Sequence, residues 1–152
     1  MSVPYASASS GLKAREEITK MLAKFGCESV GFMDDLVERS VLLAFKHRGR
    51  QVQLRATAKG WAALYLKKHP WTPSRRSSRA AWEDVALNHG HIAVNSILRD
   101  WVKGQLTAVE CGVLSFEDVF FAHMLTNDGR PLVERITTMD LLPAPDEARP
   151  AA

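Results

Sequence analysis

The chain has 152 residues, of which 46% are hydrophobic and 24% are charged, and its formal net charge is +3. This is typical of one globular domain that folds without disulfides or a structural metal. No apolar run approaches the roughly 20 residues of a membrane-spanning helix, and the first residues lack the apolar core of a signal peptide. Two cysteines, Cys27 and Cys111, are too few for a disulfide scaffold. We therefore expect a cytoplasmic protein with no membrane partner.

The N-terminal part of the chain predicts an arm and a helix. Residues 1–10 are small, polar and aperiodic, so we expect a disordered arm there. Residues 11–25 repeat apolar side chains at helical spacing, with charged side chains between them. Gly26 comes next, and glycine is the residue that most often ends a helix. The sequence therefore predicts a helix over 11–25.

Three short strands are predicted next, at 30–33, 41–46 and 51–57. The sequence His-Arg-Gly-Arg between the last two predicts the reversal of a hairpin. Apolar and polar residues alternate along the last strand, which predicts a sheet with one buried face and one polar face. The arginines of the reversal and of this polar face are expected to be exposed: Arg48, Arg50 and Arg55.

The second half of the chain predicts helices. Residues 59–68 form a short one, which cannot continue because Pro70 and Pro73 force extended backbone. A long helix is predicted over 79–110, with Ser78 as its N-cap. Its apolar residues fall on two stripes, so the helix is either central to the fold or shared between subunits. We expect a homodimer through this helix.

The C-terminal residues predict a short helix, an extended segment and a tail. Ser115 and Asp118 have the spacing of a capping box, and the helix that they open runs to about Leu125. Residues 131–136 predict a last strand or extended segment. Residues 142–152 have the composition of a disordered tail.

Together these elements predict an α+β fold in a single domain, residues 11–141. A small antiparallel three-stranded sheet, in the order helix–strand–strand–strand–helix, is packed by helices. A long C-terminal helix and a following short helix complete the fold.

The segment from Val109 to His123 reads VECGVLSFEDVFFAH. It resembles a group of small bacterial and prophage-encoded proteins with the pattern V-E-x-G-x-x-(S/T)-F-E-(D/E)-x-F-x-A-H, followed by an Asp-Gly turn, here Asp128–Gly129. The resemblance implies a protein of a phage or another mobile element, located in the cytoplasm of a bacterial host cell. It brings no activity with it, because none is established for the group.

The order helix, three strands, helix is also that of double-stranded-RNA-binding domains and of the core of PD-(D/E)xK nucleases. Ala58–Gly60 lies where the basic helix of the first family begins, but a single lysine replaces that family's lysine cluster. For the nuclease, Asp34 or Asp35 would be the first acid and Lys46 the lysine, but Ala44 occupies the place of the second carboxylate. Two acids are needed to hold Mg²⁺ against a phosphate, so we do not expect nuclease activity.

Metal and catalytic motifs are weak in this sequence. His89 and His91 are two residues apart on a helix, so their side chains point about 200° apart and cannot bind one ion together. The chain contains no Walker loop, no G-x-S-x-G and no H-E-x-x-H motif. We predict no catalytic residue, no metal site and no cofactor.

Charge is distributed unevenly along the chain. Residues 46–79 hold ten basic side chains and no acidic one, whereas residues 80–152 hold five basic and eleven acidic ones. An acid-free basic segment is typical of a polyanion site, above all for nucleic acid. Trp71 lies between two prolines, where burial is difficult, and an exposed indole stacks well on an unpaired base. The predicted nucleic-acid-binding residues are Lys46, Arg48, Arg50, Arg55, Lys59, Lys67, Lys68, Trp71, Arg75, Arg76 and Arg79.

Two other interpretations stay open. The acidic C-terminal helices could fold back over the basic segment and neutralise it. Alternatively, the protein is a protein–protein interaction module of a mobile element, such as an inhibitor or adaptor of a host complex, or an oligomeric structural protein, and uses the helix 79–110. Trp61 and Tyr65 are predicted to pack in the core instead of binding bases. The choice between single-stranded and duplex nucleic acid also stays open.

Overall fold

A computed structural model describes residues 2–146. Its three strands form one antiparallel sheet in the order β1-β2-β3, so the predicted α+β fold is confirmed. The elements are α1 (Gly11–Phe25), β1 (Ser29–Asp35), β2 (Ser40–His47), β3 (Arg50–Thr57), α2 (Lys59–Lys68), α3 (Arg79–Glu110), α4 (Phe116–Phe120), the 3₁₀ helix η1 (Phe121–His123) and α5 (Leu132–Thr137).

Local sequence explains both hairpins of the sheet. Between β1 and β2, the Asp35 carboxylate accepts the backbone N–H groups of Val37 and Glu38 at 3.1 and 2.9 Å, which holds the turn. Between β2 and β3, Arg48 and Gly49 both adopt positive φ, as a two-residue turn of this twist requires. The register then pairs His47 with Arg50, and every apolar residue of β3 meets one of β2.

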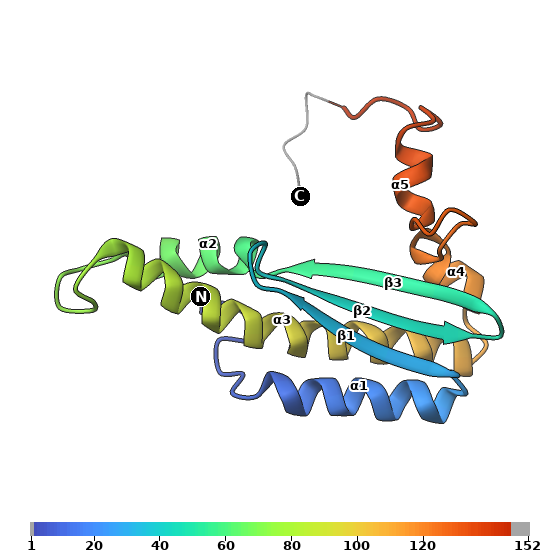
Figure 1. Ribbon diagram of the computed structural model, residues 1–152, viewed down its shortest axis with the longest axis horizontal. Helices are drawn as coiled ribbons and strands as arrows, with labels where there is room; N and C mark the ends of the chain where they lie inside the picture. The colour runs from blue at the N-terminus through green and yellow to red at the C-terminus, as the bar shows by residue number, and fades with distance from the viewer. Residues whose placement is uncertain (1, 147–152) are drawn as a thin grey trace.

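The core lies between one face of the sheet and two long helices. Figure 1 shows α1 and α3 running side by side along the sheet. Buried side chains of α1 and α3, such as Leu22 and Val102, interlock with those of β2 and β3, such as Leu43 and Val52. The opposite face is open to solvent: Met33 is 67% exposed, and Arg55 is exposed as predicted.

Both apolar stripes of α3 are covered within the chain. The N-terminal half of α3 packs on α2, and α1 packs along its other side. Among the large apolar residues of α3, Ile97 alone counts as exposed, at 37%. The expected homodimer stays a prediction, but the second stripe no longer requires one, because α1 covers it.

The N-terminal residues differ from the disordered arm expected at 1–10. In the described residues 2–10, Val3 is only 3% exposed and packs with Trp61. The Trp61 indole donates to the carbonyl of Pro4 at 2.8 Å, and the Tyr5 hydroxyl donates to Asp100 of α3. One buried valine and two long-range hydrogen bonds hold this polar segment against the body.

The C-terminal region also departs from expectation. The capping box of Ser115 and Asp118 is present, but α4 ends at Phe120, which is fully buried. After η1 the chain extends, and Met124 forms a bridge with Val52 at the edge of β3. Residues 131–136 were expected to be extended, and this is wrong beyond Pro131: Pro131 is the N-cap, with φ −57° and ψ 141°, and α5 begins at Leu132. Pro131 forms a bridge with Leu125, and within residues 2–146 no strand pairs with the segment that follows it.

The predicted tail over 142–152 lies partly outside the described residues, which end at 146. Within residues 2–146, none of the helices combines the length and the apolar character of a membrane span.

Candidate nucleic-acid interface

The fold divides the predicted basic residues among three places. Lys46, Arg55 and Lys59 lie on or beside the open face of the sheet. Arg48 and Arg50 lie at the β2–β3 turn, at one end of the molecule. The other five cations lie at the opposite end, where α2 ends and α3 begins (Figure 1): Lys67, Lys68, Arg75, Arg76 and Arg79.

Two of the open-face cations are paired with acids. Lys46 lies 3.6 Å from Glu28, and Lys59 lies 3.0 Å from Glu38. Both acids precede the basic segment in the chain, so these two lysines are not neutralised by the acidic C-terminal helices. An exposed ion pair contributes little free energy, about 0–1 kcal/mol, but it does reduce the charge offered to a polyanion.

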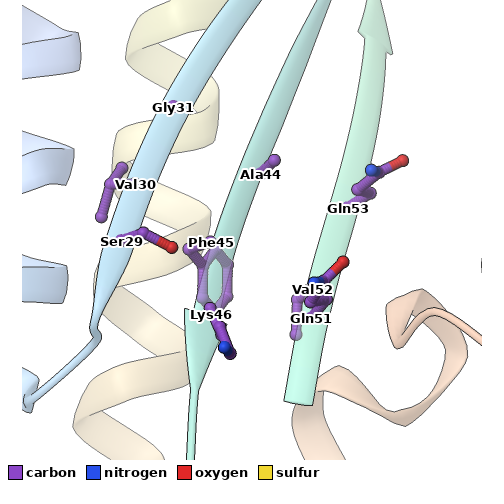
Figure 2. Close-up of a pocket in the computed structure, with 9 residues that line it drawn as sticks. All are labelled: Ser29, Val30, Gly31, Ala44, Phe45, Lys46, Gln51, Val52 and Gln53. Carbon is purple, nitrogen blue, oxygen red and sulfur yellow. The ribbon is translucent and has the colours of Figure 1, made fainter. Parts of the chain in front are cut away.

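The open face carries a shallow hollow of about 350 Å³. Figure 2 shows the residues that line it, on three neighbouring strands, with α3 behind the sheet. Gly31 and Ala44 pair at its centre and have no bulk to fill it, while Gln51 and Gln53 line it from β3. The aromatic residue among those that line the hollow, Phe45, is 3% exposed and packs in the core, so the hollow offers mainly polar side chains and one paired lysine and does not suit base stacking.

Two tryptophan indoles donate hydrogen bonds to backbone carbonyls of the α2–α3 connection (residues 69–78). The Trp82 indole of α3 donates to the His69 carbonyl at 2.8 Å, and the Trp71 indole donates to the Arg76 carbonyl at 3.1 Å. The Arg75 guanidinium donates to the Pro70 carbonyl at 2.6 Å. The two prolines prevent helix formation, and these bonds give the loop one defined shape.

Two arginines of this region lie over indole rings. The Arg75 guanidinium is 5.4 Å from the ring centre of Trp82, and that of Arg79 is 5.7 Å from Trp71. These are cation–π distances. Trp71 is half-buried, and Arg79 occupies one of its faces. A base that stacks on Trp71 must use the other face or displace this guanidinium.

The five cations around the connection are exposed, and none of them forms an ion pair within residues 2–146. Three of them, Arg75, Arg76 and Arg79, surround the start of α3, whose first turn contains no acid. The positive end of a helix dipole disfavours nearby cations and favours anions. Cations gathered there are therefore electrostatically costly without a bound anion, and a phosphate would relieve that cost.

Trp61 lies in the core, as the sequence predicts. It is 9% exposed and stacks on Tyr65 with ring centres 5.4 Å apart. Tyr65 is half-buried and also contacts the rings of Trp82 and His69. This aromatic cluster packs against residues at both ends of the connection, so its role is to hold the connection in place and not to contact a ligand.

Sequence reasoning missed Trp82 as a residue that positions the connection. The sequence does contain a signal for this role. Trp82 lies in the first turn of the predicted helix, next to a loop with two prolines whose backbone carbonyls need hydrogen-bond donors. Sequence reasoning also missed that Phe25 and Phe116 approach the β2–β3 turn. No local signal joins these two residues, because they come from helices far apart in the chain.

The metal and nuclease interpretations gain no support from the geometry. In the described residues, no three histidine, cysteine, aspartate or glutamate side chains gather as a metal site requires. Asp34 is instead held by Arg15 and lies 3.3 Å from His91. Ala44 pairs with Gly31 and Gln53, so the register brings no second carboxylate to that position.

Comparison with models of protein families, with curated proteins and with solved structures finds no match to this chain.

Proposed function

We propose that this protein binds nucleic acid without catalysing a reaction on it, and that the α2–α3 connection makes the main phosphate contacts. The supporting observation is the group of five exposed cations around the α2–α3 connection, none of which forms an ion pair within the described residues. Action in the cytoplasm of a bacterial host cell, as part of a phage or other mobile element, belongs to the same proposal.

The test removes charge from the connection and compares it with an equal change elsewhere. Arg75, Arg76 and Arg79 are replaced by Ala in one variant, and Lys13, Lys20 and Lys24, exposed on α1, are replaced by Ala in the control. Both variants lose three positive charges. Binding to labelled single-stranded and duplex oligonucleotides is measured by fluorescence anisotropy over a salt series.

Binding should weaken strongly in the connection variant only, and its salt dependence should flatten by about 0.7 per lost phosphate contact for single strands or about 0.9 for duplex DNA. The comparison of the two substrates also decides the strandedness. Equal losses in both variants would mean that only net charge matters, and no loss in either would overturn the proposal.

Trp71 tests base stacking separately. Trp71→Ala should weaken single-strand binding more than duplex binding, because only unpaired bases stack on an indole, at about 1–3 kcal/mol per base. Thermal melting is measured alongside, since the indole also bonds the Arg76 carbonyl. An equal loss on both substrates would assign Trp71 to shaping the loop instead.

A protein–protein interaction module is the second candidate function. Its support lies after α3, where seven large apolar side chains are exposed: Val113, Leu114, Phe121, Val133, Met139, Leu141 and Leu142. Helix α3 itself, which the sequence favoured for this role, buries most of its apolar residues within the chain. Affinity for an apolar partner would respond weakly to salt, which separates the two functions experimentally.

A further inference from the structure

A second cavity lies at the end of the molecule opposite the connection, beside the β2–β3 turn. Its volume is about 430 Å³, within the roughly 300–1,000 Å³ of small-molecule sites. Four elements meet there: the end of α1 (Phe25), the hairpin (His47, Arg48 and Arg50), the end of α3 (Val109) and the start of α4 (Phe116 and Glu117).

One wall of the cavity is aromatic. The His47 ring lies 4.9 Å from Phe25 and 4.8 Å from Phe116, centre to centre, and the two phenyl rings are within 17° of parallel. All three side chains are only partly buried. Partly exposed rings of this kind favour a ligand with an aromatic face that packs against them.

Two arginines and one carboxylate, that of Glu117, also line the cavity. Arg48 and Arg50 are both exposed, and neither forms an ion pair within residues 2–146. Arg48 adopts φ 49°, a position in a two-residue turn where Asn, Asp or Gly is favoured. Arg48 keeps this backbone conformation, which is unfavourable for an arginine, and lines the cavity together with Arg50. Two guanidinium groups that lack carboxylate partners are well suited to one phosphate group.

We propose that this cavity binds a nucleotide, with its base against the aromatic wall and its phosphate at Arg48 and Arg50. The Glu117 carboxylate lines the same cavity and accepts hydrogen bonds only. It therefore favours a base whose edge presents adjacent N–H donors, as guanine does. The base explains the aromatic wall, the phosphate explains the arginines, and neither an isolated anion nor an apolar ligand would use both.

The cavity lies far from the α2–α3 connection, so the proposal goes beyond the proposed function. β3 is eight residues long and runs from the turn beside the cavity toward the other end of the molecule, so its length alone covers roughly 25 Å. The bound group is either a free nucleotide or the terminal nucleotide of a single strand. These two ligands present the same base and phosphate to the cavity. They differ in whether the α2–α3 connection also binds the rest of a strand.

The experiment titrates guanosine 5′-monophosphate, guanosine and inorganic phosphate into the protein and measures heat. The monophosphate should bind at least tenfold more tightly than either part alone. Arg50→Gln should weaken its binding at least tenfold, whereas Arg55→Gln, on the same strand but on the open face, should leave it unchanged. Phe116→Leu should also weaken binding, and a melting curve checks that this variant folds.

No binding of the monophosphate, or equal binding of phosphate alone, would overturn the proposal, as would equal losses in the two arginine variants. The connection variant (Arg75, Arg76 and Arg79 to Ala) should still bind the monophosphate, which separates this site from the proposed function. A 5′-phosphorylated oligonucleotide that competes with the monophosphate, where its unphosphorylated form does not, identifies the strand end as the source. No competition by either form identifies the free nucleotide, whereas equal competition by the two forms would contradict both sources, because the strand would then bind without a terminal phosphate.

Discussion

At the residue scale, a polar network joins α1, β1 and α3. Arg15 donates its Nε–H to the Asn95 amide oxygen at 2.8 Å and pairs with Asp34, while its guanidinium lies 5.2 Å from the Phe32 ring centre. Asn95 is 1% exposed and donates in turn to the His91 carbonyl at 2.8 Å. The buried Asn95 side chain has hydrogen-bond partners on both its oxygen and its nitrogen, so loss of one partner leaves a buried polar atom without a hydrogen bond.

Asp34 makes the stability of the fold depend on pH. Hydrogen bonds from the Arg15 guanidinium hold the pKa of Asp34 below its ordinary value of 3.8. The charged form is therefore favoured in the folded state, and the stabilisation present above pH 4 is lost as pH falls through the lowered pKa. Asp34→Asn should cost up to about 1 kcal/mol at pH 7, because a pair this exposed is screened by solvent.

Urea unfolding at pH 7, 5, 4 and 3 checks this prediction. The gap between wild type and Asp34→Asn should be constant down to about pH 4 and close below it. Glu16→Gln, on the exposed side of α1, should change stability by less than about 0.5 kcal/mol throughout. A gap that widens in acid would contradict the assignment.

The two cysteines should differ in reactivity. Burial raises the pKa of the Cys27 thiol to about 11, whereas Cys111 is exposed. At pH 8 only about one Cys27 in a thousand is the reactive thiolate. Ellman's reagent should therefore modify one thiol quickly in the native protein, and Cys111→Ser should abolish this fast phase while Cys27→Ser keeps it. Two fast thiols in the native wild type would show that Cys27 is accessible.

At the element scale, one glycine sets how closely α2 and α3 approach. A Cβ at Gly90 of α3 would lie 2.9 Å from the Ala58 carbonyl oxygen and 3.3 Å from the Trp61 ring. The carbonyl belongs to the backbone at the start of α2, so it cannot turn aside. The close approach of α2 and α3 therefore requires a residue without a Cβ at position 90, although alanine is the more favourable residue in a helix interior.

Gly90→Ala should lower the free energy of unfolding by about 1–3 kcal/mol, because the helices must separate. Gly104→Ala is the matched control on the same helix, where a Cβ meets nothing within 4 Å. This control should gain up to about 1 kcal/mol from helix propensity. Denaturant unfolding of the two variants gives opposite signs if the packing is as described, and a gain in both would refute it.

At the scale of the whole molecule, α3 spans the distance between the two candidate sites. Figure 1 shows the α2–α3 connection at one end and the β2–β3 turn at the other. The buried residues of α3 face α1, α2 and the sheet, so the helix works as the spine of a single chain. The open sheet face between the two ends carries paired lysines and exposed Arg55.

Self-association through α3 has a direct test in Ile97, the exposed large apolar residue of that helix. Because α1 and α2 cover both stripes, Ile97→Arg should leave the sedimentation coefficient unchanged, whatever the oligomeric state of the wild type. A shift to half the mass in the variant would instead place the predicted dimer interface on α3.

The order of the elements follows from the sequence alone, because local patterns encode it. Alternation over 51–57, the Ser78 cap and the Ser115–Asp118 box each predict structure from a few neighbouring residues. The basic segment is visible in the same way. The exposure of Arg48 and Arg50 follows from the predicted reversal and that of Arg55 from the sheet alternation, and the exposure of all three is confirmed.

Tertiary structure decided how those charges are divided and which residues join them. Consecutive cations of one segment end up on the open face and at two opposite ends, because a strand and a helix each carry the chain many ångströms along one axis. Val3 is buried because Trp61 lies against it, and Phe25 meets Phe116 because α1 and α4 flank the same turn. Such contacts join residues distant in sequence, and no local pattern contains them.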